Sequence, residues 1–156
     1  MRNIIVFLIF ITVNAAYSQT ATNTEAKDTS NVYHQALKIY VKNLAQSSTE
    51  NYTLLIEKNY LFTDRLPKQL EGYKIEYLDG YDINEKLKRK NPITVIRIIP
   101  LRLEKGVFFI NIIPFTVKKE SKRNIRYINS GGDGIIFDFD CSTNTFRFKR
   151  IEHGNI

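Results

Sequence analysis

Apolar residues near the start of the sequence recur at spacings of three and four, the pattern of one amphipathic helix. The apolar positions are Val32, Tyr33, Ala36, Leu37, Tyr40, Val41 and Leu44. The polar residues Lys38, Lys42 and Asn43 occupy the other side. An apolar stripe of this width has to be buried against another element, so we expect a helix of about 15 residues that packs on the rest of the fold.

The periodicity changes from helix to strand after residue 52. Residues 52–57 and 73–78 predict strands, the second of them by regular alternation of apolar and polar residues. Residues 66–70 predict a turn or a single helical turn. Asp82 and Glu85 have the spacing of a capping box, which predicts a short helix that ends before Pro92.

The C-terminal half of the sequence is rich in expected strands. Residues 93–103 and 107–118 flank a turn at Gly106, where glycine permits positive φ. Pro100 and Pro114 lie within these two strands and indicate a bulge, a bend or an edge position, because proline cannot donate to a neighbouring strand. Further strands are expected at residues 126–129, 134–140 and 145–151.

The last two strands form a hairpin with two allowed registers. A four-residue loop at 141–144 places Asp138 opposite Arg147, whereas a two-residue turn at 143–144 places Asp140 there. Either register leaves aromatic residues on one face and an acid–base pair on the other, and both kinds of cross-strand pair are stabilising.

These elements together predict an α+β fold, with the N-terminal helix packed on a curved, mainly antiparallel sheet of about five or six strands. This order of elements suits a cystatin-like or nuclear-transport-factor-like arrangement, which carries no activity with it. We expect residues 30–156 to form a single α+β domain.

The first 18 residues have the pattern of a cleavable export signal. Arg2 supplies the positive start, residues 4–13 are almost entirely apolar, and Ala16 and Ser18 are small residues suited to cleavage before residue 19. The apolar run is too short for a membrane span of about 20 residues. No cysteine lies near the cleavage point, so we expect a periplasmic or extracellular protein that is not lipid-anchored, with residues 19–29 as a flexible leader.

Removal of residues 1–18 from the chain of 156 leaves 138 residues, enough to bury a core without disulfides. Loss of Arg2 lowers the formal net charge from +7 to about +6. A basic exported protein is attracted to anionic envelope material such as lipopolysaccharide or acidic glycans, although a modest positive charge also simply favours solubility.

No catalytic, cofactor-binding or metal-binding residue is assigned from the sequence. His34 and His153 have no metal-ligand spacing, and the glycines at 131–134 precede a strand rather than the helix of a phosphate-binding loop. Cys141 is the only cysteine and has no histidine nearby in the sequence, so we expect a small, partly buried apolar role for it. A carboxylate remains available for acid–base chemistry, and the sequence does not choose among Asp64, Glu76, Asp79 and Asp138, so enzymatic activity is disfavoured but open.

Two basic stretches are the candidate contact residues for an anionic partner. They comprise Lys86, Lys88, Arg89 and Lys90, and then Lys118, Lys119, Lys122, Arg123 and Arg126. If the fold brings the two stretches together, they form one patch, and if it keeps them apart, they are two solvated turns.

Several short segments carry a family resemblance. Several features in this order resemble small exported proteins of Bacteroidota: Leu66-Pro67, residues 72–75, the capped short helix, the two proline-bearing strands, and the segments 137–141 and 154–156. The end of the signal at Ser18-Gln19-Thr20 is also similar to exported proteins of that group. The resemblance implies a Gram-negative periplasm or exterior and brings no known activity.

We therefore expect a non-enzymatic exported domain that binds anionic envelope material or another envelope protein through the basic stretches. One alternative is a small ligand-binding protein or enzyme with a pocket between helix and sheet. A second is an inhibitor-like module that acts through a loop or a strand edge.

Overall fold

The structure is a computed structural model that describes residues 31–47, 53–122 and 124–154. The expected export signal at 1–18 and leader at 19–29 lie outside the described residues, as does Arg123. In the part of the chain that is described, no helix has the length and apolar character needed to cross a membrane.

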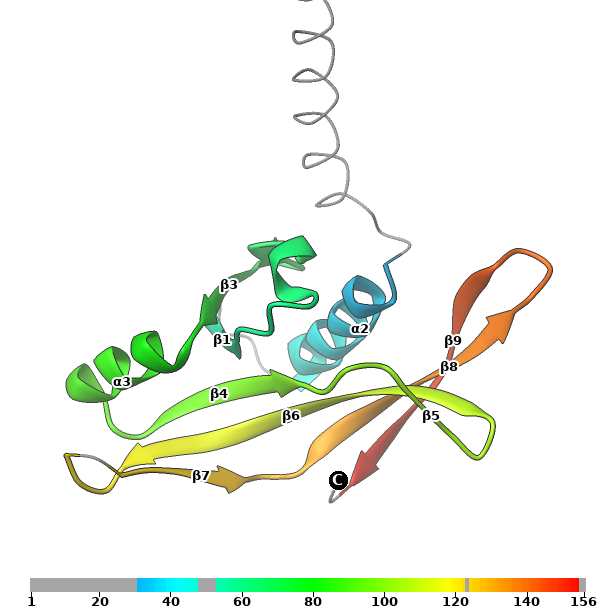
Figure 1. The fold of residues 1–156 in the computed structure, drawn as a ribbon. Coiled ribbons are helices and arrows are strands. Elements are labelled where there is room, and N and C mark those ends of the chain that lie inside the picture. The colour runs from blue at the N-terminus through cyan, green and yellow to red at the C-terminus, as the bar shows by residue number, and fades with distance from the viewer. Residues whose placement is uncertain (1–30, 48–52, 123, 155–156) are drawn as a thin grey trace, which may run out of the picture.

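The described residues form helices and strands of an α+β fold, as expected (Figure 1). In chain order the elements are α2 Val32–Ser47, β1 Thr53–Glu57, the short 3-10 helix η1 Thr63–Arg65, β2 Gln69–Leu70, β3 Tyr73–Leu78, α3 Gly80–Arg89, β4 Ile93–Ile98, β5 Arg102–Glu104, β6 Val107–Lys119, β7 Ile125–Asn129, β8 Gly132–Asp140 and β9 Thr145–Gly154. Residues 66–70, expected to be a turn, include the short strand β2.

The strands form one open, mixed sheet in the order β2-β3-β1-β4-β6-β8-β9, with β5 and β7 also paired to β6. β1 runs parallel to both β3 and β4, and the other pairs are antiparallel. The prediction of five or six strands was wrong, because the described residues contribute nine. The alternation of side chains reveals a strand but not the direction in which it runs. Because β2 runs antiparallel to β3, the chain reverses its direction twice between β1 and β3.

α2 packs on one face of the sheet, which confirms the expected role of the amphipathic helix. The side-chain oxygen of Asn31 accepts hydrogen bonds from the backbone N–H groups of Tyr33 (2.9 Å) and His34 (3.4 Å), which satisfies the start of the helix. Buried residues of the helix meet buried residues of β6 and β8: Ala36, Leu37, Tyr40 and Val41 against Ile110, Ile112, Ile135 and Phe137.

α3 begins three residues earlier than the sequence suggested. Asp79, not Asp82, is the N-cap residue: it accepts from the Asp82 N–H at 2.9 Å, and the Asp82 carboxylate accepts from the Asp79 N–H at 3.3 Å. Ile83 and Leu87 of α3 pack with Val117 in a second cluster, on the opposite face of the sheet from α2. Figure 1 shows β1 and β3 standing between the two helices.

Pro100 and Pro114, the two prolines expected within strands, lie where the pairing of strands changes. Pro100 lies between β4 and β5, so the single strand expected over 93–103 is two strands. Pro114 lies inside β6 where its outer neighbour changes: Ile112 pairs with β8, whereas Phe115 pairs with β7. The Pro114 carbonyl accepts a hydrogen bond from the N–H of Ser130, at 3.4 Å, in the link between β7 and β8. Proline, which has no N–H to donate, therefore lies where β6 exchanges one neighbouring strand for the other.

The final hairpin adopts the register of the four-residue loop. Asp138 lies opposite Arg147 and Phe139 opposite Phe146, as one of the two expected registers requires. Cys141, for which a partly buried position was expected, is exposed because it opens the loop.

Candidate functional site

The two basic stretches lie at the same end of the molecule. Lys86, Lys88 and Arg89 occupy the last turns of α3, and Lys90 follows the helix. Their place at the helix C-terminus complements the helix dipole. Lys118 and Lys119 end β6, Lys122 lies in the turn, and Arg126 lies in β7. Figure 1 shows α3 beside the β6–β7 hairpin.

Hydrogen bonds tie the two stretches together. The Asn91 side-chain amide donates to the Lys119 carbonyl at 3.0 Å and accepts from the Lys119 N–H at 3.0 Å. The Lys119 ammonium also donates to the Asn84 side chain of α3 at 2.8 Å. The apolar contacts beneath, from Leu87 and Val117, fix the helix against the hairpin. We call the joined surface, comprising the described members of both stretches, the basic end.

Part of the positive charge at the basic end is paired. Lys86 contacts Glu76 at 2.6 Å, Lys88 pairs with Glu85, and Arg126 and Lys118 share Glu120 at 3.3 and 3.9 Å. The hydrogen bond from Glu85 raises the pKa of Lys88. Three further cations are exposed and form no ion pair with any described residue: Arg89, Lys90 and Lys122. The surface therefore keeps an excess of positive charge.

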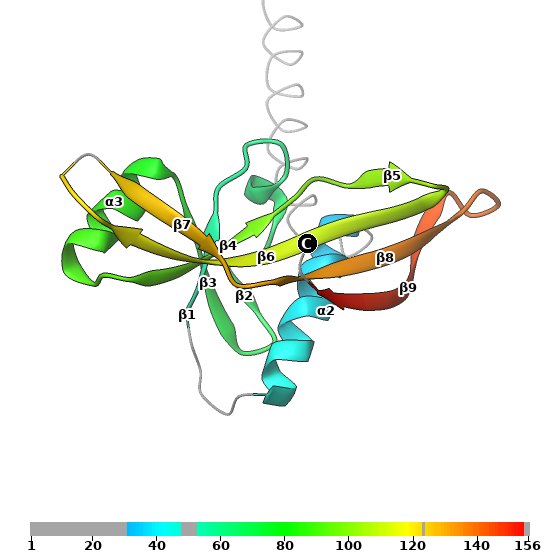
Figure 2. The same cartoon turned by 90° about the horizontal axis from the view of Figure 1, so that it is seen from below.

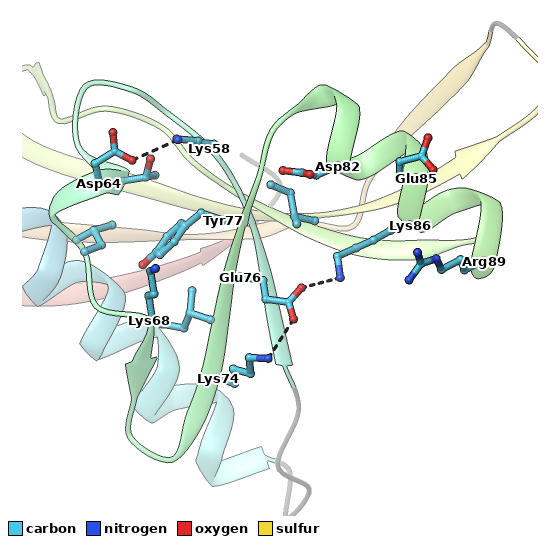
Figure 3. A pocket seen from close by; sticks show the side chains of 14 residues that line it. Lys58, Asp64, Lys68, Lys74, Glu76, Tyr77, Asp82, Glu85, Lys86 and Arg89 are labelled. Atoms are coloured by element: carbon cyan, nitrogen blue, oxygen red, sulfur yellow. Dashed lines mark ion pairs between the residues drawn. The ribbon is translucent and has the colours of Figure 1, made fainter.

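A cavity of about 780 Å³ adjoins the basic end, between α3, β3 and the segment around η1 (Figure 3). Its lining combines the basic side chains of Lys58, Lys68, Lys74, Lys86 and Arg89 with the acidic ones of Asp64, Glu76, Asp82 and Glu85. Lys58, Lys68 and Lys74 were not assigned from the sequence. The alternation of Tyr73 and Ile75 with Lys74 already indicates that Lys74 points away from the α2 core, but no pattern brings Lys58 and Lys68 to the same place.

The carboxylate of Glu76 is held between two lysines in this cavity (Figure 3). It lies 2.6 Å from Lys86 and 3.5 Å from Lys74. The hydrogen bond from Lys86, aided by the charge of both lysines against a small burial penalty, lowers the pKa of Glu76. A carboxylate with a lowered pKa is a poor general acid or base at neutral pH.

The floor of the cavity includes Tyr77. Its hydroxyl donates to the Pro67 carbonyl at 2.8 Å, and burial raises its pKa. Lys58 pairs with Asp64 at 3.5 Å. Lys68 and Arg89, on opposite sides of Glu76, form no ion pair within the described ranges, so they are the cations the cavity offers to a ligand.

The space between α2 and the sheet is occupied by side chains along most of the helix. A groove of about 500 Å³ remains near its C-terminal end, lined mainly by apolar residues that include Tyr40, Leu44 and Pro114. Within residues 31–47, 53–122 and 124–154, no three histidine, cysteine or acidic side chains gather as metal ligands.

Comparisons with protein-family models, with curated proteins and with solved structures found no match.

Proposed function

We propose that the protein is an exported binding domain that uses the basic end to hold an anionic glycan, such as the phosphorylated sugars of lipopolysaccharide. The observation that carries this proposal is the reciprocal pairing of Asn91 with Lys119, which joins two cationic segments far apart in the sequence into one surface. Phosphate and carboxylate groups along a glycan match a series of separate lysines and arginines.

The location rests on the signal pattern of residues 1–18 and the resemblance to exported proteins of Bacteroidota. The neighbouring cavity supports the proposal, since Lys68 and Arg89 extend the cationic surface inward.

The test is binding to lipopolysaccharide vesicles at increasing ionic strength. Attraction between exposed charges is screened by salt, so affinity has to fall steeply. Reversal of two unpaired cations, Lys90→Glu with Lys122→Glu, is expected to abolish most binding. Lys38→Glu with Lys42→Glu changes the net charge equally and serves as the matched control, because these lysines belong to α2 and not to the basic end. Each of them lies 3.8 Å from Glu71.

Equal loss of binding in the two double variants means that only net charge matters and that no site exists at the basic end. Salt-insensitive binding contradicts the proposal as well. Binding to an acidic envelope protein but not to the vesicles replaces the glycan with a protein partner.

A small-ligand or enzymatic function is the second candidate, supported by the apolar groove beside α2. A cystatin-like or nuclear-transport-factor-like arrangement stays a proposal: α2 lies on the sheet as it requires, while the parallel pairs of β1 depart from a fully antiparallel sheet. Structure determination of the protein with a hydrophobic ligand in this groove tests the candidate.

A further inference from the structure

A second groove, of about 500 Å³, lies on the face of the sheet that faces away from α2. Figure 2 shows β5, β6 and β8 from this side with no helix in front of them. Residues of four strands line the groove, among them Arg102, Phe109, Asn111, Gly134, Ile136 and Arg150. Its volume falls within the range of about 300–1,000 Å³ common for small-molecule sites. The groove shares no lining residue with the basic end.

Asn111, which lines this groove, is a buried polar residue. The residue is 4% exposed, yet its side-chain amide forms no hydrogen bond with any described residue. Its backbone carbonyl accepts a hydrogen bond from the Ile99 N–H at 2.8 Å. No described polar side-chain atom is sealed off without a partner, so the amide of Asn111 opens into the groove. Buried amides in folded proteins almost always have a hydrogen-bonding partner.

Gly134 leaves the space beside this amide open. It lies directly opposite Asn111 in the pairing of β6 with β8. A Cβ at residue 134 would lie 3.4 Å from the Asn111 side-chain oxygen and 3.7 Å from the Glu152 carbonyl. These are ordinary contact distances, so a methyl group fits there and occupies the space that glycine leaves to a ligand.

One wall of the groove presents a guanidinium group that is not neutralised. Arg102 lies over the ring of Phe109 at 4.7 Å and forms no ion pair within the described part of the chain. Arg150, by contrast, is bonded to Glu152 at 2.9 and 2.5 Å. A guanidinium group held against a ring suits a carboxylate, which it binds through two parallel hydrogen bonds.

We infer that this groove binds a small molecule that carries an amide and a carboxylate on a short apolar body, the chemistry of an N-acylated amino acid or of the last residue of a peptide. The ligand amide pairs with the Asn111 amide, which has both a donor and an acceptor to offer. The ligand carboxylate meets Arg102, and the apolar body rests on Phe109 and Ile136. This inference is independent of the proposed function.

The experiment is an NMR titration of the isotope-labelled protein with the N-acetyl derivatives of alanine, valine, leucine and phenylalanine, each tested singly at millimolar concentration. At least one is expected to shift the Asn111 side-chain amide and Gly134 resonances in a saturable way. Its methyl ester, which lacks the carboxylate, and the matching fatty acid, which lacks the amide, are expected to bind at least tenfold more weakly.

Two variants separate binding from folding. Gly134→Ala fills the space beside the amide and is expected to weaken binding at least tenfold with an unchanged melting temperature. Asn111→Leu keeps the side-chain volume, and it is expected to remove the preference for the N-acetyl compound over the fatty acid. Lys149→Ala, outside the groove, is the control that leaves binding unchanged.

The inference is overturned if none of the four compounds gives a saturable shift at these resonances, or if both variants bind as the unmodified protein does. A peptide ending in the preferred residue distinguishes the two sources of the ligand. Tighter binding of the peptide indicates a chain terminus, and weaker binding indicates a free acylated amino acid.

Discussion

The two faces of β6 show how differently one strand can be used. On the α2 side, Ile110 and Ile112 are completely buried beneath the helix. On the other side, Asn111 has no hydrogen-bonding partner among the described residues, and Phe109 and Phe115 are half-buried under arginines. The strand is nearly all apolar on both sides, so the covering helix, rather than residue type, decides which side becomes a closed core. The uncovered side retains room for a ligand.

The largest expected effect is a stability difference between neighbouring residues of this strand. Ile112→Ala leaves a void in the closed core and is expected to lower the free energy of unfolding by about 4 kcal/mol. Ile113→Ala, on the uncovered side, is expected to lower it by about 2 kcal/mol, because Ile113 is 7% exposed and is not one of the residues packed in the core under α2. Urea unfolding of both variants measures the difference. Equal losses would mean that something covers the second face in solution.

Alkaline pH probes the closed side through Tyr40. Burial, aided by the charge of Asp133, raises the pKa of Tyr40 from 10.0 to about 12. The folded protein therefore holds this proton more tightly than the unfolded chain. The protonated Tyr40 contributes fully to the free energy of unfolding below pH 10. As the pH rises from 10 toward 12, the unfolded chain loses this proton first, and the free energy of unfolding falls by about 2 kcal/mol. When the free energy of unfolding is measured from about pH 9 to about pH 11.5, it is expected to decline less steeply with pH in Tyr40→Phe than in the unmodified protein.

On the uncovered side, a charged pair takes the place of an apolar core. Arg97 donates to Glu57 at 2.5 and 3.2 Å, and its guanidinium lies 4.9 Å from the Phe115 ring and 5.3 Å from the Tyr127 ring. Arg97→Ala is expected to cost about 1.5 kcal/mol, since Glu57 loses its partner.

Arg102→Ala is the control for this prediction, because that residue has a ring contact but no ion pair among the described residues. It is expected to cost about 0.5 kcal/mol in thermal unfolding experiments. A cost for Arg102→Ala that matches Arg97→Ala would show that ring contacts, not the pair with Glu57, stabilise this side.

The smallest effect concerns α3, which covers the other end of this face. Asp79→Ala removes the N-cap side chain and is expected to destabilise the protein by about 1 kcal/mol. Glu85→Ala removes only an exposed ion pair with Lys88 and is expected to lower the free energy of unfolding by about 0.3 kcal/mol. Calorimetry that finds no difference would show that the capping box is dispensable.

Local patterns in the sequence predicted the local parts of the fold well. The spacing from Val32 to Leu44 gave α2, the alternation at residues 73–78 gave β3, and the Asp138–Arg147 pair gave one of the two allowed registers of the last hairpin. α3 was found with the wrong start, because Asp79 and Asp82 both suit the N-cap and only the observed hydrogen bonds distinguish them.

Features that depend on distant pairing could not be predicted. Nothing in the segments of β1 and β3 indicates that they run parallel. Asn111 lies within an apolar run, and the space beside its amide depends on Gly134, which another strand brings opposite it. The basic stretches could be listed from the sequence, but their union depends on the hydrogen bonds between Asn91 and Lys119.

The position of α2 in the chain also determines when the fold can close. The helix is synthesised before the strands it packs on, because β6 and β8 are the ninth and eleventh of the described elements in chain order, and Phe137 of β8 belongs to the same core. Until residue 137 has emerged, the apolar stripe of α2 has no complete surface to bind. Docking of α2 therefore follows the synthesis of β8, and until then the apolar face of the helix stays open to chaperones.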